Sequence, residues 1–131
     1  MNAIQPVKAY TIVFEEYPKY IYALVHGDEY GYEVLEGFLR EVADECKKRG
    51  FDRALIEENF SATASQEDIY RVATELAELG FAEIKLAYID RFQEQQELNE
   101  FGEDVAVKNG VNVKVFSDLA SADKWLTSDE K

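Results

Sequence analysis

Hydrophobic and polar residues alternate along the first part of the chain. Aromatic and aliphatic side chains take every second position on one face of residues 7–16 and of residues 20–26. These side chains belong to Tyr10, Ile12, Phe14, Ile21, Ala23 and Val25. A two-residue period is typical of β-strands, and the intervening Tyr17-Pro18-Lys19 favours a tight turn because proline presets the backbone angle. The pattern therefore predicts an opening antiparallel hairpin.

The period changes to three or four residues between Tyr30 and Arg49. The apolar residues at this spacing are Val34, Leu35, Phe38, Leu39, Val42, Ala43 and Cys46. They fall on one face of a helix. Three basic residues at positions 47–49 and then Gly50 favour a helix end, because cations complement the negative end of the helix dipole and glycine tolerates a left-handed cap.

The succession of helix, glycine and strand occurs at Gly50, Gly80 and Gly110. The remaining expected elements are a strand at residues 53–58, a helix that Ser65 caps and Gly80 ends, a strand at 83–90, a helix at 91–109, a strand at 111–115 and a last helix capped by Ser117 or Asp118. The order β-β-α-β-α-β-α-β-α predicts an α/β fold with a mixed sheet of about five strands. Residues 1–131 are expected to form a single domain, with residues 1–6 and 127–131 frayed.

Charge narrows the range of partners. The chain has 14 Lys and Arg residues and 27 Asp and Glu residues, which gives a net charge of −13. Such a surface repels phosphate backbones, so nucleic acid is not expected as a partner. The acidic residues are spread through every segment, which favours a solubilising surface over one for cations or basic partners. No segment approaches the ~20 apolar residues of a membrane span, and the lone Cys46 fits a reducing cytoplasm.

The end of the chain carries a family resemblance. Asn109-Gly110-Val111, then Val115-Phe116-Ser117-Asp118 and then Ala122-Asp123-Lys124-Trp125-Leu126 are similar to the ending of many SpoIIAA-like proteins. With the order of elements, the chain resembles the STAS-like superfamily, which includes the anti-sigma-factor antagonists and the STAS/SEC14 proteins. The resemblance implies a STAS/SpoIIAA-like fold and protein partners, and its SEC14 side implies a small apolar ligand.

The antagonist branch carries an Asp-Ser pair whose serine is phosphorylated by a partner kinase. The equivalent segment here, residues 59–66, has no Asp-Ser pair. Ser65 is the nearest match by position, and Ser61 and Thr63 are the other candidate phosphoacceptors. The context of Ser65 fits a helix N-cap, whose hydroxyl satisfies an otherwise unpaired amide.

Catalytic and cofactor motifs are missing from the sequence. No phosphate-binding glycine loop follows a strand, and one Cys and one His cannot make a zinc site. Ser61, His26 and Glu57 could be assembled into a triad on paper, but no nucleophile-elbow sequence accompanies them. The sequence therefore predicts no enzyme, no metal and no cofactor.

Polar residues at two strand ends make a candidate ligand or partner rim. Glu57 and Glu58 end the third expected strand, Asp90 and Arg91 end the fourth, and His26 ends the second. Ligands of open α/β sheets favour this edge, although alternation directs Glu57 and Glu58 to opposite faces.

Aromatic residues crowd the opening hairpin and the approach to the first helix, at Tyr10, Phe14, Tyr20, Tyr22 and Tyr30. Their side chains are expected to pack on the sheet. Where the sheet face is left uncovered, they would form an exposed apolar patch for a partner protein, a second subunit or an apolar ligand. The leading hypothesis is a non-enzymatic cytoplasmic interaction or regulatory module. The alternatives are a carrier with a pocket lined by Tyr and Phe, and an enzyme that uses the rim.

Overall fold

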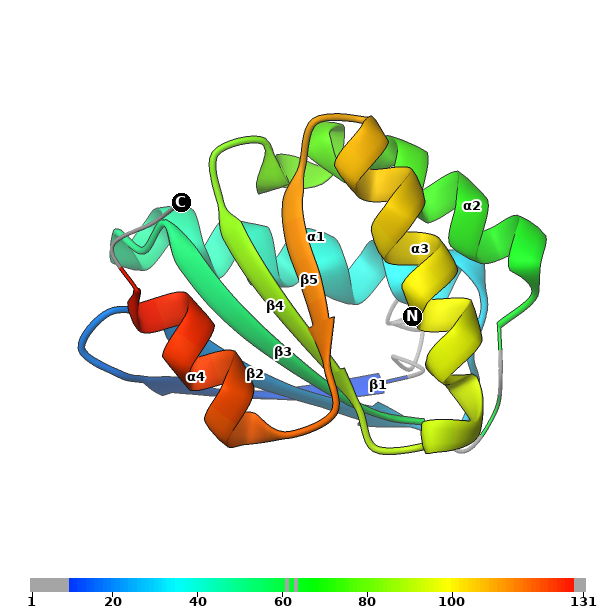
Figure 1. The fold of residues 1–131 in the computed structure, drawn as a ribbon, viewed down its shortest axis with the longest axis horizontal. Coiled ribbons are helices and arrows are strands. Elements are labelled where there is room, and N and C mark those ends of the chain that lie inside the picture. The colour runs from blue at the N-terminus through cyan, green and yellow to red at the C-terminus, as the bar shows by residue number, and fades with distance from the viewer. Residues whose placement is uncertain (1–9, 61, 63, 129–131) are drawn as a thin grey trace, which may run out of the picture.

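The structure is a computed structural model that describes residues 10–60, 62 and 64–128. These residues form one five-stranded mixed sheet in the order β1-β2-β3-β4-β5, with helices on both faces (Figure 1). The elements are β1 (Tyr10–Glu16), β2 (Ile21–Gly27), α1 (Tyr32–Arg49), β3 (Arg53–Phe60), α2 (Gln66–Glu75), β4 (Lys85–Asp90), α3 (Gln96–Lys108), β5 (Asn112–Phe116) and α4 (Leu119–Thr127). The predicted α/β class, strand number and element order are confirmed.

The opening hairpin is antiparallel, as predicted. Tyr10 pairs with Gly27 and Glu16 with Ile21, and the Tyr17 amide donates to the Tyr20 carbonyl oxygen at 2.9 Å to close the turn. The three following pairs, β2·β3, β3·β4 and β4·β5, are parallel. The carboxyl ends of β2, β3 and β4 therefore meet at one edge of the sheet.

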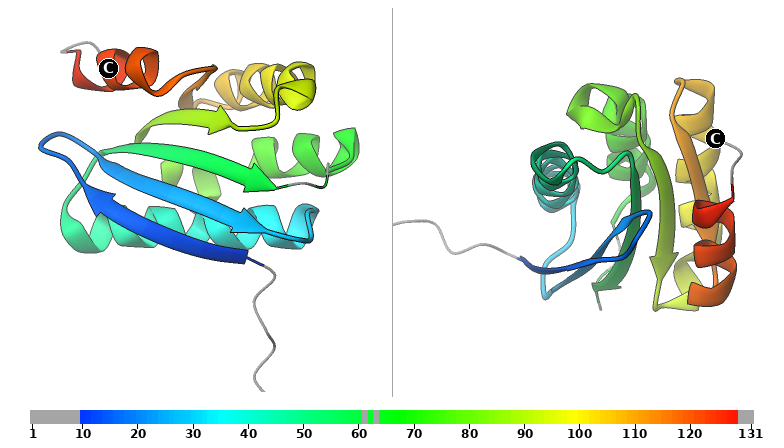
Figure 2. Two further views of the ribbon diagram at one scale, coloured as in Figure 1. Left: turned by 90° about the horizontal axis from the view of Figure 1, so that it is seen from below. Right: turned by 90° about the vertical axis from the view of Figure 1, so that its left-hand side faces the viewer.

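Two cores lie on the two faces of the sheet. The larger one lies under α1, α2 and α3, and its fully buried side chains include Phe38, Phe60 and Phe81. The smaller one lies under α4 and contains Leu55, Ile89 and Leu126. In Figure 1, α1 lies behind the sheet and α4 in front of it, and Figure 2 shows the same arrangement from two other sides.

α4 covers only part of its face of the sheet. It contacts β3, β4 and β5, whereas Val13 of β1 on the same face is 57% exposed.

Thr127 ends the helix, and the Ser128 carbonyl oxygen accepts a hydrogen bond from Arg53 at 2.8 Å. Residues 1–6 and 129–131, part of the ends predicted to fray, lie outside the described residues.

The predicted helix over residues 91–109 is wrong at its start. A short 3-10 turn occupies Gln93–Gln95, and α3 begins only at Gln96. The reason is local, because the Asp90 carboxylate accepts the Phe92 amide at 2.8 Å and directs the chain into a turn. Apolar spacing alone does not reveal such a competing hydrogen bond.

Gly80 lies inside a turn rather than just after a helix. α2 ends at Glu75, and a π-helical turn follows over Ala77–Phe81. Gly80 has a φ of 124°, and a Cβ there would lie 2.7 Å from the Ala43 Cβ of α1. Only glycine permits both the backbone angle and this close approach.

Of the helices in the described part of the chain, none is long and apolar enough to cross a membrane.

Candidate functional site

Polar side chains gather beneath the helices at the carboxyl ends of β3 and β4. Glu58 pairs in register with Asp90, and Tyr88, two residues earlier on β4, points to the same face. Tyr30 approaches from the segment that precedes α1, and Asn99 comes from α3. Elements far apart in the sequence therefore build this cluster.

Glu58 is the most buried member of the cluster, with no exposed surface. Its Oε2 accepts a hydrogen bond from the Tyr88 hydroxyl, and the Tyr30 hydroxyl also hydrogen-bonds this carboxyl group. Among the described residues its Oε1 has no hydrogen-bond partner. Burial raises the pKa of Glu58 to about 8, against the opposing effect of the two phenols. The carboxyl is therefore largely protonated at neutral pH.

Asp90 is held by hydrogen bonds from the chain that follows it. Its Oδ2 accepts from the Asn99 side-chain amide at 2.9 Å, and its Oδ1 accepts from the Phe92 amide at 2.8 Å. Burial raises the pKa of Asp90, while these two hydrogen bonds lower it. Because Asn99 is committed to Asp90, its position in the cluster is fixed.

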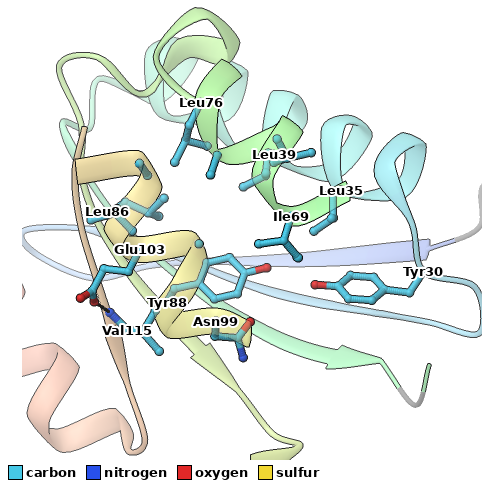
Figure 3. A pocket seen from close by; sticks show the side chains of 15 residues that line it. Tyr30, Leu35, Leu39, Ile69, Leu76, Leu86, Tyr88, Asn99, Glu103 and Val115 are labelled. Carbon is cyan, nitrogen blue, oxygen red and sulfur yellow. Dashed lines mark hydrogen bonds between the residues drawn. The ribbon is translucent and has the colours of Figure 1, made fainter. Parts of the chain in front are cut away.

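A cavity of about 70 Å³ lies against the cluster, between the helices and β4 and β5 (Figure 3). Its wall is mostly aliphatic and includes Leu35, Leu39, Ile69, Leu76 and Leu86. Figure 3 shows the Tyr30 and Tyr88 hydroxyl groups pointing toward one another, with Asn99 beside them. The cavity is therefore mostly apolar, with the two phenols and Asn99 at one end and, away from them, the Glu103 carboxylate, which accepts a hydrogen bond from the Val115 amide.

This arrangement is suited to binding a small molecule. The phenols and the amide at the polar end are neutral hydrogen-bonding groups, and the aliphatic wall offers shape and dispersion contacts. Among the described residues, no group of three or more His, Cys, Asp or Glu side chains is placed to hold a metal ion.

The sheet divides the predicted rim into two parts. Glu58 and Asp90 face α1, α2 and α3, whereas Glu57 and Arg91 face the other side. There the Glu57 carboxylate accepts from the Tyr22 hydroxyl and from Arg91 Nε at 2.6 Å. The opposite orientation of Glu57 and Glu58 follows the predicted alternation, so the two carboxyl groups do not form one site.

His26 stands apart from the buried cluster. It is exposed on β2, and its Nε2 lies 2.7 Å from the Thr11 hydroxyl of β1. The imidazole therefore interacts with a neighbouring strand rather than with the buried acids.

Ser65 caps α2 as its context predicts. Its Oγ accepts from the Asp68 amide at 3.1 Å. Ser61 and Thr63 lie outside the described residues, so the structure does not test an arrangement of Ser61 with His26 and Glu57, for which the sequence offers no nucleophile-elbow motif. Phosphorylation at any of the three candidate positions stays a prediction.

The polar end of the cavity was only partly foreseen from the sequence. The sequence marks Tyr30 only as one of several clustered aromatic residues, and it does not distinguish Tyr88 or Asn99. A tyrosine inside a strand expected to be buried is a usable signal, because its hydroxyl needs a partner. Tyr88 lies two residues before Asp90, which places both on one strand face. No comparable signal joins Asn99 to them.

Neither a protein-family model nor a curated protein matches the chain. The resemblance to the STAS-like superfamily therefore stays a prediction that rests on the chain ending and the order of elements.

Proposed function

We propose that this protein is a non-enzymatic binding module that holds a small, mostly apolar molecule with one neutral polar group. The observation that carries the proposal is the cavity in which an aliphatic wall ends at Tyr30, Tyr88 and Asn99. Buried phenols in such a place give direction to a ligand that dispersion contacts alone would not orient.

The size of the cavity limits the ligand. A volume of about 70 Å³ is roughly half that of the engineered apolar cavity that accepts benzene. It suits about three to five non-hydrogen atoms, such as a short alcohol or the end of a longer chain. A charged group is disfavoured, because the Glu58 carboxyl is largely protonated at neutral pH and the cluster offers neutral partners.

The role as an interaction or regulatory module is compatible with this proposal. α2 and α3 contact each other extensively and both line the cavity. A ligand that orders these helices would change the surface they present to a partner. An enzymatic role has less support, since His26 contacts Thr11 of β1 and does not line the cavity.

The test is an NMR titration of the protein with 1-butanol, followed on backbone amides and tyrosine rings. We expect millimolar binding with the largest shifts at Tyr30, Tyr88 and Asn99. Ala73→Val adds two carbon atoms at the aliphatic wall and should weaken binding by about tenfold or more while leaving the fold intact. Ala82→Val, at an exposed position in the turn before β4, is the matched control.

Tyr88→Phe separates the polar end from the apolar wall. It should weaken 1-butanol binding by about threefold to tenfold, because the alcohol loses a hydrogen-bond partner. Butanol shifts that spread over the surface, or equal affinity in Ala73→Val and the unaltered protein, would overturn the proposal.

A further inference from the structure

A second concave surface lies on the opposite side of the sheet from the cavity, between the hairpin turn and α4. It has a volume of about 350 Å³, and its lining includes Glu15, Tyr17, Tyr20, Tyr22 and Asp123. Figures 1 and 2 show the turn that joins β1 to β2 beside α4. The site is thus independent of the cavity and of the function proposed for it.

Aromatic rings dominate this concave surface and stand in two orientations. The Tyr17 and Tyr20 rings stack at 5.1 Å with an interplanar angle of 15°. The Tyr22 ring is nearly perpendicular to Tyr17, at 89° and 6.3 Å. Rings set at right angles form the corner of an aromatic cage, in which electron-rich faces surround a cation.

Hydrogen bonds fix two of the three rings. The Tyr20 hydroxyl donates to Asp123 Oδ1 at 2.7 Å, and the Tyr22 hydroxyl donates to Glu57. Burial and these carboxylates raise the pKa of both phenols, so they stay neutral at neutral pH. A phenol that donates to a carboxylate gains electron density on its ring, which strengthens the attraction for a cation.

The charged side chains that line the concave surface are acidic, and the nearby Arg91 guanidinium is paired with Glu57. The lining includes the Glu15 and Asp123 carboxylates and, among the described residues, no lysine or arginine. Lys19, in the same turn, is directed to the Thr127 carbonyl oxygen at 3.3 Å. The positive end of α4 is offset by Asp118, which accepts the Ser121 amide at 2.7 Å.

We propose that Tyr17 and Tyr22, with the buried Tyr20 ring stacked on Tyr17 and with Glu15 and Asp123 in the lining, bind an alkylammonium group. The aromatic faces recognise its polarised methyl or methylene groups, and the carboxylates balance its charge. Two sources share this chemistry, a free amine such as choline and the ammonium group of a lysine side chain on a partner.

The first experiment compares choline with 3,3-dimethyl-1-butanol, a neutral molecule of the same shape, by NMR titration at constant ionic strength. We expect choline to bind with shifts centred on the three tyrosines, and the neutral molecule to bind about tenfold more weakly. Equal affinity for the two molecules, or no saturable binding of choline, would overturn the proposal.

Variants then test the cage itself. Tyr17 is 40% exposed, so its replacement should leave the fold intact. Tyr17→Leu should weaken choline binding by about threefold to tenfold, whereas Tyr17→Phe should retain it. Tyr70→Leu, at another exposed tyrosine, controls for loss of an aromatic surface. Unchanged choline affinity in Tyr17→Leu would contradict the cage.

A matched pair of charge variants separates local from overall electrostatics. Glu15→Gln should weaken choline binding by about twofold to fivefold, and Glu29→Gln, at an exposed acid elsewhere, should not. Equal effects would mean that net charge alone attracts the cation.

Short acetylated peptides with a central lysine or trimethyllysine distinguish the two sources. Tighter binding of a peptide than of choline assigns the site to a protein partner, and the reverse order assigns it to a free amine.

Discussion

At the scale of single residues, Glu58 links the fold to pH. It is fully buried, it accepts a hydrogen bond from Tyr88, and burial raises its pKa to about 8. In the unfolded chain a glutamate ionises near pH 4.3. Between these two values the folded protein keeps a proton that the unfolded chain has lost. Rising pH therefore favours the unfolded chain through this group.

We expect Glu58→Gln to remove this dependence. The free energy of unfolding of the unaltered protein should fall by up to about 1.4 kcal/mol per pH unit between roughly pH 5 and pH 8 because of Glu58. The stabilising effect is fully present below the unfolded pKa and is lost as pH approaches the folded pKa. Urea unfolding at several pH values measures the difference between the two proteins.

Glu29→Gln, at an exposed acid, is the control for that series, and its pH dependence should match that of the unaltered protein. The same pH slope in Glu58→Gln and the unaltered protein would show that Glu58 ionises in the folded state as it does in the unfolded chain.

At the scale of elements, the basic side chains of Lys85 and Arg53 hold the carboxyl end of α4 on the sheet. Lys85 is only 4% exposed, and its Nζ donates to the Trp125 carbonyl oxygen at 2.6 Å and lies 4.5 Å from the centre of the Trp125 ring. Arg53 donates to the carbonyl oxygens of Leu126 and Ser128. These bonds satisfy carbonyl groups that a helix end leaves unpaired, and they place positive charge at the negative end of its dipole.

We expect Lys85→Met to loosen α4 selectively. Loss of a charge-assisted hydrogen bond should lower the free energy of unfolding by about 2 kcal/mol. Hydrogen exchange should become faster in α4 and stay slow in α1. Fluorescence of the single tryptophan, Trp125, reports the same change. Lys19→Met, which removes a longer and exposed contact, should lower the free energy of unfolding by less than about 0.5 kcal/mol. An equal decrease in the two variants would contradict the stabilising role of Lys85.

Local patterns predicted most of these elements, because the signals that define them are local. Alternation located the hairpin and the opposite directions of Glu57 and Glu58, and the capping context located Ser65 at the start of α2. The late start of α3 was missed, because it depends on where the Asp90 side chain points. The meeting of Tyr30 and Tyr88 could not be predicted either, since it depends on where the segment before α1 places Tyr30 relative to β4. The same holds for burial of Lys85 under α4.

At the scale of the whole molecule, the net charge of −13 opposes compaction. Mutual repulsion of like charges is stronger in the folded state, where they lie closer together. Salt screens this repulsion, because the Debye length falls from about 30 Å at 0.01 M to about 10 Å at 0.1 M.

We therefore expect sodium chloride to stabilise the protein. Raising its concentration from about 0.01 M to 0.2 M should increase the free energy of unfolding by about 1 kcal/mol, as measured by urea denaturation. Tetramethylammonium chloride at equal ionic strength should stabilise the protein further if the aromatic cage is occupied. A decrease in stability with added sodium chloride would show that attractive ion pairs outweigh the repulsion.

The two edges of the sheet differ in a way that bears on self-assembly. At the β5 edge, the Val115 amide donates to Glu103 Oε1 of α3 at 2.5 Å, and the strand is short and carries Lys114. A backbone group already bonded within its own chain cannot template an incoming strand, and lysine on a short edge deters pairing further. Of the two edges that the described residues form, β1 is therefore the more receptive to strand addition. Two copies joined through β1 would use the more receptive edge of each, and growth into a fibril would then have to proceed through β5, where the Glu103 contact and Lys114 oppose pairing.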